Sequence, residues 1–326
     1  MLIAEIGSVH DGSFGNAQKL IELAAACCAD AVKFQTHIAE AESLIDAPSP
    51  EFFKDEPRFN YFRRTCFSID QWQKLKQLAE RHGLVFLSSP FSIEAADLLE
   101  SLDMAVYKIP SGEVTNIPLL ERIASFKKPV FLSSGMSNWK ELDNAVAVFR
   151  NQCDLTVMQC SSVYPCPPSD IGLNVLREMQ QRYACAVGFS DHSLGLAAPI
   201  AAAALGASVI EKHFTFSKFM YGSDAKHSME PDEFKVLASA VKDVWKMLEC
   251  PVNKDEIASY AIMKDVFQKS IASAVPLKAG TYIVREHLSF KKPGTGIPAS
   301  EYAELIGKKI KIDCGANVLM RTEWFE

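Results

Sequence analysis

Short apolar runs alternate with segments of helical periodicity through the first 250 residues of the chain. The first run, residues 2–6, stops at Gly7, and residues 15–28 then repeat apolar side chains at helical spacing. This pattern predicts a strand followed by an amphipathic helix. The same pattern recurs along the chain. The eight predicted strands cover residues 2–6, 31–36, 84–89, 105–109, 129–134, 155–160, 188–192 and 209–214.

Most of these runs are continuously apolar, which indicates strands buried on both faces. Eight such strands separated by amphipathic helices favour a (β/α)8 TIM barrel over an open doubly wound sheet. A Gly-x-Gly-x-x-Gly fingerprint does not follow the first strand, which weakens a dinucleotide-binding interpretation. We therefore expect an α/β fold in which residues 1–250 form the catalytic barrel.

The pattern changes beyond residue 250. Residues 255–267 are typical of a helix, and short strand-like pieces separated by glycine and proline follow them. We expect a helical linker at residues 251–269 and a small β-rich domain at residues 270–326.

Composition narrows the class of protein. Hydrophobic residues make up 48% of the chain and charged residues 23%, as in a globular enzyme with a large core. The net charge of −6 argues against a nucleic-acid-binding surface, so an anionic ligand would need a local cluster of cations. Nine cysteines without a Cys-x-x-Cys pair are expected to be reduced. Neither a signal-peptide pattern nor an apolar run of ~20 residues is present, so we expect a cytoplasmic protein with no membrane partner.

Polar and ionisable side chains gather where the predicted strands end. A single lysine at a strand end is usually a solvated charge, but the carboxyl ends of all barrel strands meet at one face. Polar ends on all eight strands therefore predict one shared pocket. The side chains expected there are Glu5, Lys33, Gln35, Ser88, Ser89, Lys108, Ser111, Glu113, Ser133, Ser134, Ser161, Ser162, Ser190, Asp191, His192, Glu211, Lys212 and His213.

Two histidines end the seventh and eighth strands. Neutral imidazoles such as His192 and His213, from neighbouring strands, are good ligands for a divalent metal ion. A lone buried histidine is more often a satisfied core residue, but this pair lies beside Asp191 and Glu211 and favours a metal site. Lysines and serines at the other strand ends, without a glycine-rich loop, predict a cradle for a phosphate or carboxylate.

The strand ends and the C-terminal region also carry recognisable motifs. They lie at residues 4–7 with 10–12, 32–36, 88–91, 107–113, 132–136, 164–165, 188–192 and 211–215. In this order they resemble the signature segments of the sialic acid synthase family. Residues 292–296, Lys-Pro-Gly-Thr-Gly, resemble the motif of that family's C-terminal antifreeze-protein-like domain, of the β-clip or SAF type. The resemblance implies a TIM barrel followed by this small domain.

The resemblance also implies an activity like that of N-acetylneuraminate synthase. In this reaction phosphoenolpyruvate condenses with an open-chain N-acylated hexosamine, such as N-acetylmannosamine, to give a nine-carbon 2-keto acid and phosphate. His192 and His213 would hold Mn²⁺ or Mg²⁺, which polarises the sugar aldehyde. Glu5, Glu113, His192 and His213 are then expected to be catalytic, with Glu113 steering the water that adds to carbon 2.

Substrate contacts are implied for further residues. Phosphoenolpyruvate would be bound by Lys33, Lys108, Ser111, Ser133 and Ser190. Glu5, Gln35 and Asp224 would contact the sugar or a metal-bound water. Substrate binding is also expected of Ser89, Ser162 and Tyr164.

The same resemblance implies a domain-swapped homodimer. In the family the small domain of one subunit caps the barrel of its partner and donates an arginine to the acceptor sugar. Lys292 stands at the matching position, and a lysine keeps the charge but lacks the bidentate fork of arginine. Val9 stands where an asparagine is common. These departures concern the sugar more than the reaction.

Three alternatives remain open at this point. The acceptor could be a diacetamido-trideoxyhexose, which would make the protein a legionaminate or pseudaminate synthase. A Schiff-base aldolase using Lys33 or Lys108 would share the fold but would not need the histidine pair. A non-catalytic carbohydrate-binding protein would leave the acids and lysines at the strand ends unexplained.

Overall fold

A computed structural model describes residues 1–48 and 56–326 of the chain. Two compact units are present, Met1–Cys250 and Pro251–Glu326. No helix in the described part of the chain has the length and apolar character needed to cross a membrane.

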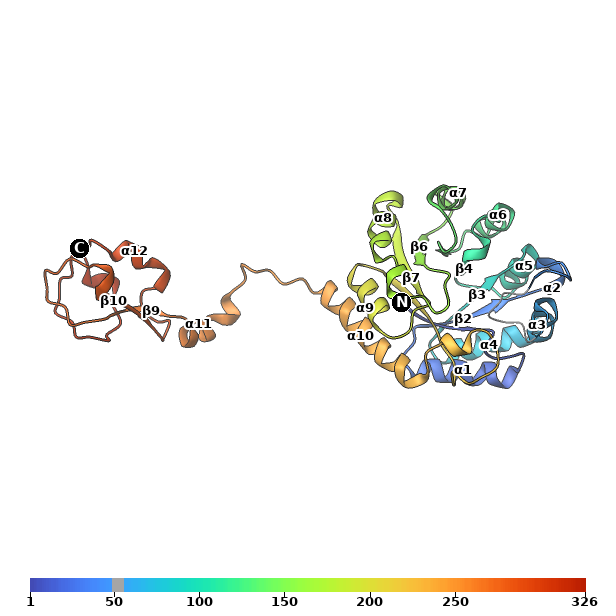
Figure 1. The fold of residues 1–326 in the computed structure, drawn as a ribbon, viewed down its shortest axis with the longest axis horizontal. Coiled ribbons are helices and arrows are strands. Elements are labelled where there is room, and N and C mark those ends of the chain that lie inside the picture. The colour runs from blue at the N-terminus through green and yellow to red at the C-terminus, as the bar shows by residue number, and fades with distance from the viewer. Residues whose placement is uncertain (49–55) are drawn as a thin grey trace. The chain divides into compact units, whose positions relative to one another are not determined.

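The first unit is a closed barrel of eight parallel strands, as the sequence predicted (Figure 1). Hydrogen bonds join the strands in the order β3-β2-β1-β8-β7-β6-β5-β4, and β3 also contacts β4, which closes the sheet. The strands are β1 (Leu2–Gly7), β2 (Ala31–Thr36), β3 (Val85–Pro90), β4 (Tyr107–Ile109), β5 (Val130–Ser133), β6 (Leu155–Cys160), β7 (Ala186–Asp191) and β8 (Val209–His213).

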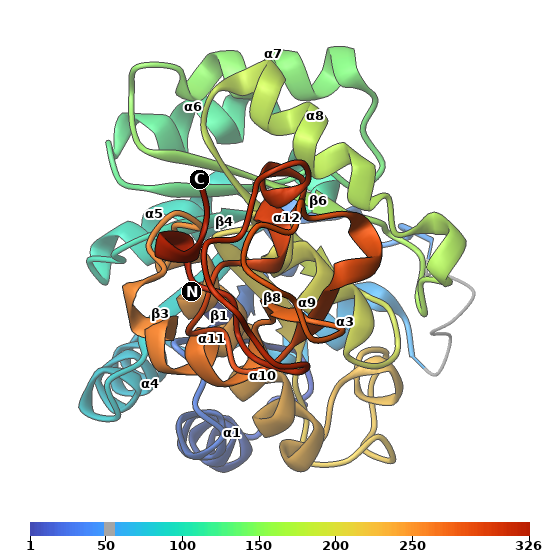
Figure 2. The same cartoon turned by 90° about the vertical axis from the view of Figure 1, so that its left-hand side faces the viewer.

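Helices surround this barrel, and Figure 2 shows α6, α7 and α8 along one side of it. The helices of the first unit are α1 (Phe14–Ala26), α2 (Ala39–Glu42), α3 (Arg58–Thr65), α4 (Ile69–Arg81), α5 (Ile93–Ser101), α6 (Ile117–Ser125), α7 (Trp139–Phe149), α8 (Leu173–Tyr183), α9 (Ala197–Ala204) and α10 (Pro231–Glu249). Local sequence fixes several of their ends. Ser68 and Gln71 form a capping box at the start of α4, for example.

Two helices, α2 and α3, lie in the segment between β2 and α4. Ala39 and Tyr61 are buried, and the Tyr61 hydroxyl donates to Ser8 Oγ just after β1. Residues 49–55 of that segment lie outside the described residues.

The interior of the barrel has an apolar floor beneath a polar upper layer. The floor contains Ile3, Ala31, Leu87, Val106, Phe131, Met158 and Val209. Side chains two positions apart point to the same face of a strand. The residues two positions after these are Glu5, Lys33, Ser89, Lys108, Ser133, Cys160 and Glu211. Seven of the eight strands thus pack the barrel with one inward side chain and place a polar or ionisable side chain, or a cysteine, two positions later.

The period of two also corrects the expectation that every polar strand end faces the pocket. Ser88, Asp191 and Lys212 each directly follow a residue that points inward, so their side chains point to the other face of the strand. They do not line the cavity described below. Lys212 Nζ lies 2.6 Å from Asp191 Oδ2 and also donates to the Ser193 carbonyl. This buried ion pair fixes the chain that follows β7.

The second unit contains the β-rich fold that the sequence predicted. β9 (Ser270–Ser273) and β10 (Leu288–Lys291) pair antiparallel, and isolated bridges join further short segments. α11 (Ala261–Phe267) precedes them and α12 (Tyr302–Leu305) follows. Ile271, Ile310 and Met320 belong to a separate apolar core of this unit.

Candidate functional site

A cavity of about 410 Å³ opens among the carboxyl-end residues of the barrel strands. Twelve of the fifteen residues to which the sequence assigned a catalytic or substrate-binding role line it. They are Glu5, Lys33, Gln35, Lys108, Ser111, Ser133, Ser162, Tyr164, Ser190, His192, His213 and Asp224. The barrel topology therefore brings together side chains that are up to 219 positions apart, from Glu5 to Asp224.

Three predicted site residues lie outside this lining. Ser89 is fully buried and its Oγ is 3.4 Å from Lys33 Nζ. Glu113 is half-buried and accepts a hydrogen bond of 2.7 Å from Asn116 Nδ2. Lys292 belongs to the second unit, where its Nζ lies 4.9 Å from the centre of the Phe267 ring. Their proposed roles in substrate binding and catalysis stay predictions.

Two lysines and two carboxylates form a charged cluster in the cavity. Lys33 Nζ is 2.8 Å from Glu5 Oε1 and 3.7 Å from Glu211 Oε1, and Lys108 Nζ is 3.2 Å from Glu211. All four side chains are at most 6% exposed. Buried charges require such compensation, because an unpaired charge inside a protein is strongly destabilising. Glu211 was foreseen only as a polar strand end, yet it connects the two lysines.

The two carboxylates of this cluster differ in proton affinity. Burial raises the pKa of Glu5 to about 7, against the opposing effect of Lys33. Burial also acts on Glu211, but Lys108 and Lys33 outweigh it and hold the pKa of that carboxylate well below its usual value. Two nearby acids whose pKa values are pushed apart are typical of acid–base chemistry. Glu5 can exchange a proton near neutral pH, whereas Glu211 stays ionised.

The two predicted metal ligands lie side by side in the cavity. The rings of His192 and His213 lie 5.5 Å apart between centroids. His192 Nδ1 donates to the Ser161 carbonyl at 2.7 Å, so in the neutral imidazole Nε2 carries the lone pair and accepts from the Tyr164 hydroxyl at 2.9 Å. Burial lowers the pKa of His213 to about 4, so this imidazole is neutral at pH 7.

His213 Nδ1 is buried and has no hydrogen-bond partner among the described residues. A buried nitrogen without a partner is costly unless something binds it. No group of three or more His, Cys, Asp or Glu side chains in the described residues could hold a metal ion. An ion held by these two imidazoles would have to take its remaining ligands from oxygen atoms of substrate or water.

Several cavity residues had not been predicted for the site. His37, Arg58, Tyr61, Phe62 and Phe91 line one side of the cavity. They come from α3 and from the residues that follow β2 and β3. All of them except Arg58 have aromatic rings, and aromatic residues are equally typical of core packing.

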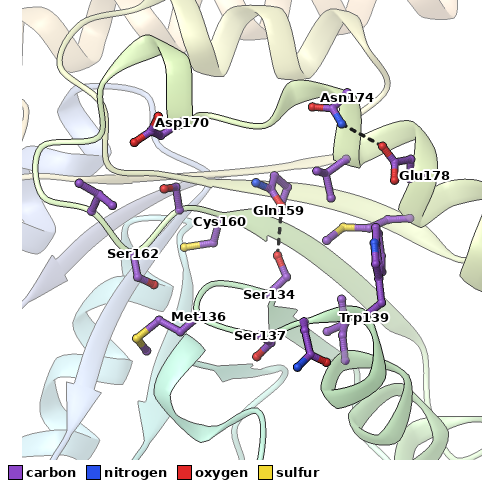
Figure 3. Close-up of a pocket in the computed structure, with 16 residues that line it drawn as sticks. Ser134, Met136, Ser137, Trp139, Gln159, Cys160, Ser162, Asp170, Asn174 and Glu178 are labelled. Atoms are coloured by element: carbon purple, nitrogen blue, oxygen red, sulfur yellow. Dashed lines mark hydrogen bonds between the residues drawn. The ribbon is translucent and has the colours of Figure 1, made fainter.

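A second, larger cavity of about 780 Å³ adjoins the first and shares Met136, Cys160 and Ser162 with it (Figure 3). Its described lining contains Asp170 and Glu178 but no lysine, arginine or histidine. The anionic substrate expected from the sequence needs cations, so the smaller cavity, which contains Lys33 and Lys108, is the candidate reaction site.

Comparison with known proteins shows the family to which the chain is similar. The pattern of the NeuB family matches residues 20–253, and that of the SAF domain matches residues 268–318. The N,N'-diacetyllegionaminic acid synthase of Campylobacter jejuni is 35% identical, over 94% of this chain and 95% of its own. The N-acetylneuraminate-9-phosphate synthase of Homo sapiens is 32% identical, over 95% of this chain and 88% of its own.

Among solved structures, the N-acetylneuraminic acid synthetase of Leptospira borgpetersenii is similar with a TM-score of 0.71 and 29% identity. That match covers 80% of this chain and 89% of the Leptospira chain.

Proposed function

Since the chain belongs to the NeuB family, we propose that it condenses phosphoenolpyruvate with an N-acylated hexosamine to give a nine-carbon 2-keto sugar acid and phosphate. Synthases of this family are phosphoenolpyruvate-using condensing enzymes. One observation carries the proposal: two lysines, two carboxylates of unlike proton affinity and two adjacent histidines share one cavity. The proposed acceptor is N-acetylmannosamine. The alternative product is N,N'-diacetyllegionaminic acid, for which the Campylobacter relative is named.

Lys33 and Lys108 anchor phosphoenolpyruvate in this proposal. Burial opposes the charge of Lys33, but Glu211 and Glu5 raise its pKa, so the ammonium group stays protonated. The hydroxyls of Ser111, Ser133 and Ser190 line the same cavity and supply further donors. Ammonium and hydroxyl donors together suit the phosphate and carboxylate of this substrate.

Condensation then forms a bond between carbon 3 of phosphoenolpyruvate and the aldehyde carbon. The aldehyde oxygen takes a proton from Glu5, whose pKa of about 7 permits the transfer. Water adds to carbon 2, and the proton that it releases returns to the Glu5 carboxylate. Collapse of the adduct then expels phosphate. The fixed orientation of the two bound substrates supplies much of the rate. Glu113 is the proposed guide for the water.

His192 and His213 would hold a divalent ion, Mn²⁺ or Mg²⁺. When bound there, the ion polarises the aldehyde as a Lewis acid. For His192 Nε2 to bind the ion, the Tyr164 hydroxyl, 2.9 Å away, would have to give up its hydrogen bond to that nitrogen.

A Schiff-base aldolase is less well supported. Its lysine must lose a proton to become a nucleophile. The raised pKa of Lys33 acts in the opposite direction. An aldolase would also leave the partnerless nitrogen of His213 without a role.

We also propose a domain-swapped homodimer in which Lys292 of one subunit contacts the acceptor in the barrel of the other. A mixture of His213→Ala and Lys292→Ala subunits tests this idea. In an equal mixture about half of the dimers should contain one variant of each kind. In such a heterodimer only the barrel that keeps His213 meets a partner that keeps Lys292, so up to about one site in four of the whole population should be active. A mixture no more active than its separate components would contradict the exchange of Lys292.

The reaction itself is tested by measuring phosphate release from phosphoenolpyruvate with a panel of amino sugars. The panel contains N-acetylmannosamine, its 6-phosphate and a 2,4-diacetamido-2,4,6-trideoxyhexose. We expect release that depends on one of these acceptors and on added Mn²⁺ or Mg²⁺. Release with none of them would refute the proposed function.

A further inference from the structure

Three stacked rings form one wall of the reaction cavity. The His37 ring lies between Phe62, at 3.7 Å between centroids, and Phe91, at 4.1 Å, with interplanar angles of 12° and 20°. All three residues line the cavity. The stack fixes the plane of an imidazole that is only 7% exposed. No step of the reaction above uses this histidine.

Both nitrogens of His37 are hydrogen-bonded. Nδ1 lies 2.9 and 3.0 Å from the two carboxylate oxygens of Glu42, whose side chain is 4% exposed. Nε2 lies 3.2 Å from Gln35 Oε1. His37 therefore connects a buried carboxylate of α2 to an amide at the end of β2.

The direction of these bonds follows from the chemistry of the groups. Gln35 Nε2 donates to Glu5 Oε1 at 2.9 Å, because an amide nitrogen cannot accept. Gln35 Oε1 must then accept from His37, so His37 Nε2 carries a hydrogen. A hydrogen bond between His37 Nδ1 and Glu42 then needs one further proton, which the carboxylate favours and which burial, lowering the pKa of His37, opposes. A hydrogen-bonded chain thus runs from Glu42 through His37 and Gln35 to Glu5.

This chain decides which oxygen of Glu5 stays available. Oε1 receives Gln35 Nε2 and is 2.8 Å from Lys33 Nζ. Oε2 is buried and has no hydrogen-bond partner among the described residues. Glu5 lines the cavity, and Oε2 is the oxygen left to meet a substrate.

We propose that His37 is a positioning residue for the acceptor sugar: held by Glu42 and by the two phenylalanines, it fixes the Gln35 amide and so leaves Glu5 Oε2 facing the acceptor. The inference rests on the proposed function and adds a specific polar group to its acceptor site. Phosphoenolpyruvate binding should depend less on this chain, because Lys33 contacts its last member, Glu5, but Lys108 pairs with Glu211 instead.

Kinetics of His37→Phe test the proposal, because phenylalanine keeps the ring stack and removes both hydrogen bonds. We expect KM for the acceptor to rise about tenfold or more, while KM for phosphoenolpyruvate stays within about twofold. The melting temperature should fall, because the Glu42 carboxylate remains buried without its partner, so both KM values are measured at a temperature at which the variant is folded. His37→Gln should recover much of the loss, since its amide can still donate to Gln35. The exposed His82 provides a matched control: His82→Phe should leave both KM values unchanged.

A double variant gives an independent check. Once Gln35→Ala has broken the chain, adding His37→Phe should raise KM for the acceptor little further. Additive effects, equal changes in both KM values, or wild-type kinetics of His37→Phe would each overturn the inference while phosphate release by the wild type continued. Failure of the wild type to release phosphate with any acceptor would remove the proposed function and this inference with it.

Discussion

Replacing His213 by alanine should abolish phosphate release and the response to divalent ions without unfolding the barrel. The loss in kcat/KM is expected to reach about 1,000-fold or more, which corresponds to the several kcal/mol that a Lewis-acidic ion contributes. The side chain is buried at the end of β8, but its Nδ1 has no hydrogen-bond partner among the described residues. Removing it therefore breaks no hydrogen bond at that atom. Phosphate release and Mn²⁺ titration of the purified variant measure the effect.

A neighbouring histidine supplies the control for this experiment. His227 lies 6.5 Å from the Tyr164 ring between centroids and does not line the reaction cavity. His227→Ala should keep ion-dependent turnover. Full activity of His213→Ala in chelator-treated buffer would falsify the metal role of the histidine pair.

Replacing Lys108 by methionine should weaken phosphoenolpyruvate binding by about 100-fold or more, the usual effect of removing one partner of a buried charge pair. The variant loses a cation that lies 3.2 Å from Glu211.

The same replacement should change stability. The pKa of Glu211, now held low by Lys108 and Lys33 against burial, should rise. The carboxylate contributes stability that is present above its unfolded pKa and lost as the pH falls through the folded value. The variant should therefore lose part of its stability at neutral pH. Calorimetric titration with phosphoenolpyruvate and thermal melts from pH 4 to pH 8 measure both effects.

Lys212→Met is the matched control, because this second buried lysine pairs with Asp191 outside the reaction cavity. It should reduce the free energy of unfolding by about 3–5 kcal/mol, since Asp191 remains buried without its partner. The folded fraction should still bind phosphoenolpyruvate with nearly wild-type affinity. Equal phosphoenolpyruvate affinities of Lys108→Met and the wild type would contradict the anchoring role of Lys108.

The contrast between these two lysines shows where sequence reasoning reaches its limit. Both lysines come at the ends of predicted strands, so they look alike in the sequence, and both are buried in the structure. Lys108 is two positions after the floor residue Val106, whereas Lys212 is three positions after Val209. The strand period of two sends one side chain into the cavity and the other away from it. Reading that period from the apolar floor would have separated them.

Other parts of the site depend on contacts between distant segments. The sequence does not show that Glu42 lies beside His37, or that the ring of Phe62 on α3 stacks on that histidine. The arrangement arises when α2 and α3 pack over the ends of β2 and β3. The opposite pKa shifts of Glu5 and Glu211 likewise depend on which lysines reach each carboxylate.

By itself, the sequence determined the barrel, the small β-rich unit and the family, because apolar periodicity and ordered strand-end motifs are local properties of the chain. It also placed most of the residues that line the candidate reaction cavity, since the strands of a closed parallel barrel all end at one face. Only the tertiary structure decided which strand-end side chains point inward, how the charges pair and which oxygen of Glu5 has no hydrogen-bond partner among the described residues. Those features depend on distances between residues far apart in the chain, which the packing of helices and strands sets.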